Sequence, residues 1–128
     1  MQEGEPIEEL RVTPDKYLPH RYAGASGDFN PIHIDPEFAR QVGLPSNILR
    51  GLYTMALVAR AGTQAADGDP AALRRLSVQF RGMGFPEKEI VVCGTVREAG
   101  DGRALVALEA EQDGNPIVRN AEAELLVP

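Results

Sequence analysis

The sequence predicts an α+β fold in which a curved antiparallel sheet wraps around one long central helix. Residues 51–66, GLYTMALVARAGTQAA, form the longest helical pattern and are apolar on nearly every side, so this helix should be buried. The chain of 128 residues indicates a single domain, residues 1–128. Strand-like segments separated by turn signals follow the helix: residues 73–82, 88–99, 102–112 and 115–128.

The central helix is expected from about Gly51 to Ala65, and its spacing suggests a buried face. Apolar residues at i, i+3, i+4 and i+7 define that face, which Leu57 and Val58 widen. The residues at this spacing are Leu52, Met55, Ala56 and Ala59. After the helix, DGDPAA at residues 67–72 predicts a polar turn into the sheet.

The turns of the sheet carry the residues that tight hairpins need. The segments AGDG at 99–102 and QDGN at 112–115 each contain an Asp-Gly pair, which suits a two-residue hairpin turn. An open sheet of this kind would leave two edges and one face in need of cover. We therefore expect the sheet to pair with a second subunit.

The segment before the central helix has one strand candidate and two helix starts. Residues 6–14 alternate loosely and predict a first strand. Thr13 and Pro14 suit the N-cap and first position of a helix, which Pro19 should disturb because proline has no N–H. Asp35 and the proline after it repeat the start signal before a helix of about two turns.

Charge and cysteine content argue against several classes of protein. Thirteen basic and nineteen acidic residues give a formal net charge of −6, which disfavours binding to nucleic acid or anionic membrane. No apolar run approaches the roughly 18 residues of a transmembrane helix, and the acidic N-terminus lacks a signal-peptide pattern. We expect a cytoplasmic protein. The single cysteine, Cys93, is interpreted as a small buried apolar residue in a strand.

The stretch SGDFNPIHID, residues 26–35, places an acid and a base on one loop. Pro31 argues against a helix here, so a compact loop is expected, in which Asp28 and His33 can converge. Asn30 can stiffen that loop through its side-chain amide, and Gly27 leaves room for a ligand. A carboxylate beside an imidazole is the minimal set of groups that holds and deprotonates a water molecule.

Other interpretations of the same stretch stay open at this point. It is also consistent with an ordinary polar turn, with Asp35 acting only as a helix cap. A metal site from Asp28, His33 and Asp35 is disfavoured, so no metal or other cofactor is expected. The other histidine, His20, has no partner motif and is expected at the surface or an interface.

Gly51 stands where the central helix begins. Helix N-termini carry unpaired N–H groups and a partial positive charge, and a glycine lets an oxygen approach those groups closely. The position therefore suits a developing oxyanion, although a plain glycine N-cap is the simpler interpretation.

Taken together, these residues resemble the MaoC-type dehydratases, the (R)-specific enoyl-thioester hydratases with a hot-dog fold. The matching motif is YAGASGDFNPIHIDPEFARQVGLPSNILRGLYTM, residues 22–55. The pattern that is matched most closely is Y-A-x-x-S-G-D-x-N-P-I-H-x-D. The hot-dog fold, a long helix wrapped by a curved antiparallel sheet, agrees with the predicted order of elements.

The resemblance implies a function and a set of site residues. The function is addition or removal of water across the C2–C3 double bond of an enoyl thioester, which gives the 3-hydroxyacyl thioester, expected as the (R) isomer, in fatty acid metabolism. Asp28 and His33 match the catalytic pair, and Gly51 matches the glycine whose N–H polarises the thioester carbonyl. The supporting loop residues are Ser26, Gly27, Asn30 and Pro31.

The resemblance also implies partners. The substrate would be an acyl thioester of coenzyme A or acyl carrier protein, and the chain would form a homodimer or pair with a second hot-dog subunit. Alternatives are a non-catalytic acyl-thioester-binding subunit and a thioesterase. The thioesterase is disfavoured because residues 51–62 contain no Asp or Glu, whereas such enzymes usually carry an acid on the central helix.

Arg50 departs from the family pattern, which usually has histidine before the glycine. An arginine at a helix N-terminus is electrostatically unfavourable unless an anion offsets it. Two interpretations follow: Arg50 points to solvent, or it contacts an anionic part of the ligand, such as a substrate carboxylate or a phosphate of coenzyme A.

Overall fold

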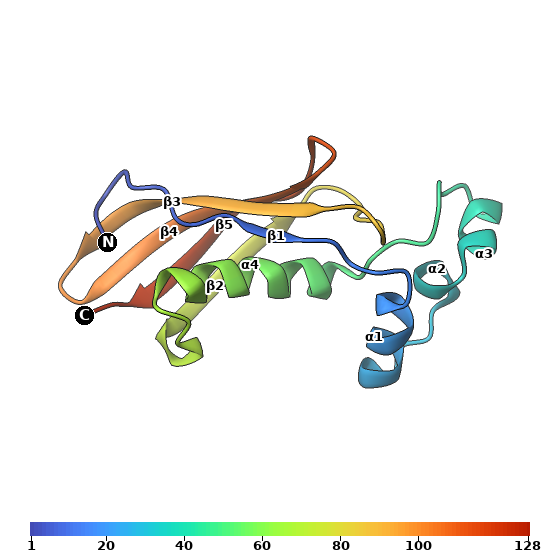
Figure 1. Cartoon of the computed structure of the whole chain (residues 1–128), viewed down its shortest axis with the longest axis horizontal. Helices are drawn as coiled ribbons and strands as arrows, with labels where there is room; N and C mark the ends of the chain where they lie inside the picture. The colour runs from blue at the N-terminus through green and yellow to red at the C-terminus, as the bar shows by residue number, and fades with distance from the viewer.

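The computed structural model describes all residues, 1–128, and confirms the predicted α+β architecture (Figure 1). One sheet and one long helix form the body of the molecule, and three short helices precede the long one. The elements are β1 (Leu10–Val12), α1 (Leu18–Ser26), α2 (Pro31–Ile34), α3 (Pro36–Gln41), α4 (Gly51–Ala65), a 3₁₀ turn η1 (Pro70–Ala72), β2 (Leu73–Phe80), β3 (Ile90–Gly100), β4 (Arg103–Gln112) and β5 (Asn115–Leu126).

The sheet has five strands in the order β1-β3-β4-β5-β2, and every neighbouring pair is antiparallel. Register shifts occur in three of the four pairings, and such irregularities bend and twist a sheet. Figure 1 shows α4 lying along one face of this sheet, with α1, α2 and α3 gathered beyond its N-terminal end. Both termini lie at the opposite end.

The two predicted hairpins form as expected. Asp101 and Gly102 have φ of 55° and 76°, and Asp113 and Gly114 have φ of 53° and 76°. Positive φ at both central residues is the type I′ turn, whose twist matches that of the flanking strands. These Asp-Gly turns connect β3 to β4 and β4 to β5, so the local signal set the register of the central strands.

The predicted buried face of α4 is right for Leu57 and Val58, which are buried, and wrong for Leu52 and Ala56, which are exposed. The side chains that pack inward are Thr54, Leu57, Val58, Ala61 and Gly62. Leu52, from the predicted face, is 67% exposed. Because the helix is apolar nearly all round, spacing alone does not select a face. Packing against the sheet does: a Cβ built at Gly62 would be in van der Waals contact with the Cβ of Ala123, at 3.4 Å. In the single chain, α4 is therefore half covered.

The first strand and first helix are shorter than predicted. Only Leu10–Val12 pairs continuously with β3, with one further bridge between Pro6 and Thr95. The helix does not begin at Thr13 and Pro14, because α1 starts at Leu18. Pro19 lies in its first turn, where a missing N–H costs nothing, so this proline starts the helix and does not disturb it.

No helix in the structure is both long enough and apolar enough to cross a lipid bilayer.

Candidate active site

The segment between α1 and α2 is held by hydrogen bonds within itself. Gly27 ends α1 at a φ of 76°, and this left-handed conformation is the structural reason for a glycine there. The Ser26 Oγ accepts a hydrogen bond from the Asp28 N–H at 3.2 Å, and Asp28 Oδ1 accepts one from the Asn30 N–H at 3.0 Å. The Asp28 backbone and side chain are thus held from both sides.

The expectation that Pro31 prevents a helix is wrong. Pro31 opens the short helix α2, and Asn30 caps it, with Asn30 Oδ1 accepting from the Ile32 N–H at 3.2 Å. Proline suits the first helical position because that N–H has no partner inside a helix. The Asn30 side chain therefore bonds to its own loop, as predicted. One turn of helix, and not an open loop, carries His33.

A backbone carbonyl determines which ring nitrogen of His33 carries the hydrogen. Its Nδ1 lies 2.8 Å from the carbonyl oxygen of Ile48, and a carbonyl only accepts, so Nδ1 carries the hydrogen. The neutral ring then has a free lone pair on Nε2, the nitrogen not bound to the protein. This is the tautomer that a base acting through Nε2 requires.

Residues 46–48 hold α2 in place, a role that the sequence did not reveal. The Asn47 side-chain amide donates to the carbonyl of His33 at 2.9 Å, and the Ile48 N–H donates to the carbonyl of Ile32 at 3.0 Å. Asn47 is 5% exposed and also accepts from the Ser46 hydroxyl at 3.1 Å. A lone asparagine after Pro45 and Ser46 has no pattern that sets it apart from an ordinary turn, which is why it was missed.

Arg50 is buried, so the interpretation that it points to solvent is wrong. Its side chain is 8% exposed. Nε donates to Asp28 Oδ2 at 3.3 Å, Nη1 donates to the carbonyl of Pro19 at 3.4 Å, and Nη2 donates to the carbonyl of Asp28. The guanidinium also lies 5.0 Å from the centre of the Tyr22 ring. Contact with a ligand anion stays an untested prediction.

The environment favours the ionised form of Asp28. The Asn30 N–H, followed by the Arg50 guanidinium, lowers the pKa of Asp28. The Asp28 side chain is 53% exposed, so its free lone pairs remain open to water. Asp28 is thus an ionised hydrogen-bond acceptor beside His33.

Gly51 begins α4, as predicted, and its surroundings leave the helix terminus open. The preceding Arg50 makes no side-chain cap, and the N–H groups of Gly51 and Leu52 have no acceptor in the chain. A Cβ at position 51 would lie 3.1 Å from Cε1 of Phe80 on β2. Gly51 thus presents free donors beside an aromatic ring.

Two other predicted polar residues, Asp35 and His20, lie outside this arrangement. Asp35 caps α3, accepting from the N–H groups of Glu37 and Phe38 at 3.0 and 3.2 Å. His20 is exposed and lies against the Tyr17 ring. No group of three or more His, Cys, Asp or Glu side chains is placed to hold a metal ion.

Cys93 lies half-buried in β3, in the strand predicted for it. Burial, with the neighbouring Glu109 carboxylate, raises the pKa of its thiol to about 11. It is therefore a protonated thiol with no role in the site.

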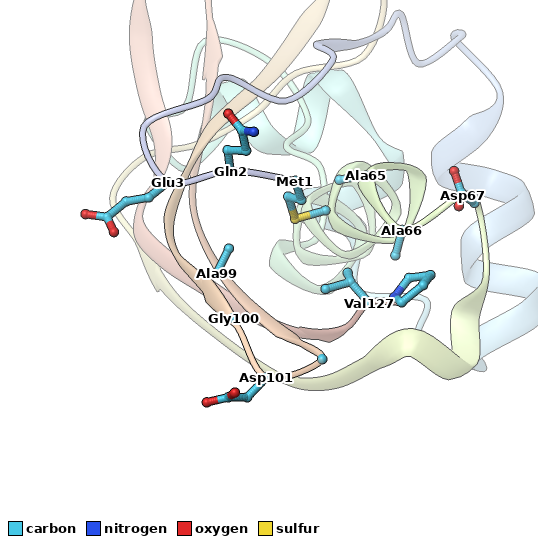
Figure 2. A pocket seen from close by; sticks show the side chains of 12 residues that line it. Met1, Gln2, Glu3, Ala65, Ala66, Asp67, Ala99, Gly100, Asp101 and Val127 are labelled. Atoms are coloured by element: carbon cyan, nitrogen blue, oxygen red, sulfur yellow. The ribbon is translucent and has the colours of Figure 1, made fainter.

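The two largest cavities do not contain the acid, the base or the helix terminus. One, of about 620 Å³, lies at the far end of α4 between Ala65, Asp67, Ala99 and the chain termini (Figure 2). Carboxylates of Glu3, Asp67 and Asp101 line it, and it contains neither Asp28 nor His33. The other, of about 650 Å³, is lined by residues such as Tyr17, Asn47 and Phe85. The site itself is open to solvent in the single chain.

The five-stranded antiparallel sheet with one long helix along its face defines the hot-dog fold, and comparison with known proteins agrees. A family model described as MaoC like domain matches residues 2–114. The chain belongs to the MaoC-like dehydratase family.

Individual relatives are similar over most of this chain. The fatty acid synthase subunit beta of Aspergillus oryzae is 38% identical over 107 residues, covering 81% of this chain and 5% of that protein. The enoyl-CoA hydratase ChsH3 of Mycobacterium tuberculosis is 37% identical over 99 residues, covering 77% of this chain and 32% of its own length. The chain thus spans a third or less of these two relatives.

A solved structure of an (R)-hydratase from A. caviae shows the same fold. It superposes with a TM-score of 0.88 at 22% identity, covering 100% of this chain and 98% of that one. At this identity the similarity concerns the fold.

Proposed function

We propose that this protein is an enoyl-thioester hydratase, adding water across the C2–C3 double bond of an enoyl thioester or removing it from the 3-hydroxyacyl product. The observation that carries the proposal is the state of the pair on the α1–α2 segment. Asp28 is ionised and accepting, and His33 has its Nδ1–H bound to Ile48, which leaves Nε2 as the base. Membership of the MaoC-like family supports the same reaction.

The reaction follows from these groups. Asp28 and His33 Nε2 hold a water molecule, and Nε2 takes one of its protons as the water oxygen bonds to C3. The C2–C3 π electrons shift onto the thioester oxygen as an enolate, which the free N–H of Gly51 stabilises. The imidazolium then returns the proton to C2 and the thioester carbonyl re-forms. Dehydration is the reverse.

An apolar acyl chain fits the rim of this site. Phe29 follows Asp28 and is 62% exposed, Leu52 follows Gly51 and is 67% exposed, and Phe80 lies against Gly51 and is 49% exposed. Large apolar side chains at such exposure mark a binding surface or an interface. The substrate proposed is therefore a fatty acyl thioester, and the product proposed is the (R)-3-hydroxyacyl thioester, by analogy with the (R)-hydratase from A. caviae that shares this fold.

The carrier and the assembly belong to the same proposal. Relatives named as enoyl-CoA hydratase and as fatty acid synthase subunit support coenzyme A and acyl carrier protein respectively. We propose that residues 1–128 act as one domain in a homodimer, or in a pair with a second hot-dog subunit. In the single chain the outer face of α4 and one edge of β2 are uncovered, and both would be covered by a partner. A cytoplasmic location stays a prediction.

The experiment is a direct assay of the purified chain. Enoyl thioesters from crotonyl to long-chain, on coenzyme A and on acyl carrier protein, are mixed with the protein, and the loss of enoyl-thioester absorbance is followed. Chiral analysis of the 3-hydroxy product identifies the isomer. Turnover on at least one carrier is expected. Absence of turnover on the whole panel, with release of free thiol, would instead favour a thioesterase.

A further inference from the structure

Arg50 occupies a position where an arginine is costly. It directly precedes α4, whose N-terminus carries a partial positive charge, and its side chain is almost fully buried. A buried guanidinium requires an anion and hydrogen-bond acceptors to be tolerated. The carboxylate that meets this requirement is Asp28, 22 positions earlier in the chain. The buried charge of Arg50 is thus paired with the half-exposed carboxylate of Asp28 at the centre of the site.

The geometry of the contact restrains Asp28 in two ways. Nε of Arg50 donates to the Asp28 carboxylate, and Nη2 donates to the Asp28 backbone carbonyl. One planar guanidinium therefore fixes both the side chain and the main chain of Asp28. The third nitrogen, Nη1, bonds to the carbonyl of Pro19 in α1, and the Tyr22 ring packs on the guanidinium. Arg50 therefore ties Asp28 to both α1 and the start of α4.

We propose that Arg50 is a positioning residue that keeps Asp28 ionised and oriented as a pure acceptor, so that His33 is the sole proton carrier of the pair. The inference rests on the proposed hydration reaction for its catalytic meaning. Asp28 then holds and orients the water, and the proton moves only through His33 Nε2. The proposal gives Arg50 a role within the chain, because its side chain is 8% exposed and each of its nitrogens donates to the chain, whereas contact with a ligand anion stays a separate prediction.

The charges around Asp28 agree with this division of roles. The permanent charge that acts on Asp28 is that of Arg50 at the start of α4, which lowers the pKa of Asp28; His33 on α2 adds to this only when its ring is protonated. A lowered folded pKa means that folding favours the ionised form. The resulting stability is present above the unfolded pKa of about 3.9 and is lost as pH falls through the folded value. Asp28 is thus charged throughout the neutral range.

The test is a carboxyl-carbon NMR titration of the full chain, with the Asp28 signal assigned by its loss in Asp28→Asn. In the wild type the Asp28 signal should titrate below the ordinary range of an aspartate. Arg50→Met should move its midpoint upward, and Arg50→Lys, which keeps the charge without the planar fork, should move it less. Arg21→Met is the matched control, since Arg21 pairs with Asp15 at 2.7 Å on the exposed side of α1 and should leave Asp28 unchanged.

Kinetics supply the second readout. Arg50→Met should lower kcat by up to about 10²-fold, the scale of a misplaced catalytic group, with little change in KM. A change confined to KM, or an Asp28 midpoint equal in wild type and Arg50→Met, would overturn the proposal. If Arg50→Met does not fold, the wild type alone decides: an Asp28 titration midpoint at or above that of an ordinary aspartate would also overturn the proposal. Failure of the hydratase proposal itself appears differently, as a wild type without turnover, whatever the titration shows.

Discussion

At the scale of single residues, the site combines two groups whose states are set by their neighbours. The Ile48 carbonyl determines which nitrogen of His33 carries hydrogen, and the Asn30 N–H and Arg50 determine the charge of Asp28. None of these partners is itself a base or nucleophile. The chemistry of the pair therefore depends on backbone groups as much as on the two side chains.

Removal of either member of the pair should abolish most of the activity without unfolding the chain. Asp28→Asn and His33→Ala are each expected to lower kcat by roughly 10²-fold or more, the scale of acid–base contributions. The control is His20→Ala, which removes the other histidine of the chain from an exposed position. Steady-state kinetics with circular dichroism checks this. Near-wild-type turnover in a variant would exclude that residue from the machinery.

Gly51→Ala tests whether the open N-terminus of α4 takes part in the reaction. The added Cβ would crowd the approach to the free N–H groups and press on Phe80. We expect kcat/KM to fall by about 10²-fold, the scale of a lost oxyanion donor, while stability is kept because alanine favours a helix.

The methyl group added by Gly51→Ala would both crowd the free N–H groups of α4 and displace the Phe80 ring, and Phe80→Ala separates these two effects. If displacement of the ring causes the loss, Phe80→Ala alone should reproduce it and the double variant should add nothing further. If the helix terminus matters, Gly51→Ala should stay impaired even when Phe80 is removed. Full activity in Gly51→Ala would show that the terminus has no catalytic role.

At the scale of elements, α4 has two different apolar faces. The inner face carries Leu57, Val58 and Ala61 against the sheet, and the outer face, which begins with Leu52, has nothing against it in the single chain. Small residues on the inner face, such as Gly62, allow the close approach of helix and sheet. The same helix is thus a core element on one side and an open surface on the other.

Matched leucine substitutions on the two faces measure this difference. Leu57→Ala is expected to lower the free energy of unfolding by about 2–5 kcal/mol, since Leu57 is 5% exposed. Leu52→Ala should stay within about 0.5 kcal/mol, measured by urea unfolding at a concentration where subunits do not associate. Equal losses for the two variants would contradict the assignment of faces.

At the scale of the whole molecule, the open surfaces lie near the proposed site. Leu52 and Phe80 flank Gly51, and one of the two edges of the sheet is formed by β2, which ends at Phe80. A second subunit on this side would cover the edge, cover the outer face of α4 and enclose the acyl chain. The proposed assembly and the proposed activity are therefore linked.

The wild-type chain is expected to form a twofold dimer, measured by light scattering coupled to size-exclusion chromatography. Ala56→Glu, which places a charge on the outer face of α4, should weaken association and reduce activity while the far-ultraviolet circular dichroism is kept. The matched control is Ala71→Glu, the same substitution in the exposed turn before β2, and this variant should stay dimeric. A monodisperse monomer with full activity would contradict the link between assembly and site.

Local chemistry accounts for the parts of this protein that could be predicted from sequence. Asp-Gly pairs required left-handed turns and so defined the hairpins, Asp35 with Pro36 marked the start of α3, and Gly51 marked the start of α4. Each of these signals acts over a few residues. The motif around Asp28 and His33 was likewise readable because its residues are close in sequence.

The remaining features depend on contacts between distant segments. Spacing identified only part of the buried face of α4, because contacts with the sheet, such as that of Gly62 with Ala123, select one face of an apolar helix. It did not identify Asn47 as the support of His33, since that hydrogen bond spans 14 positions. The burial of Arg50 against Asp28, 22 positions apart, was also hidden. Sequence patterns report which local structure is favoured, whereas desolvation and pairing of charges are decided only when the folded chain brings the partners together.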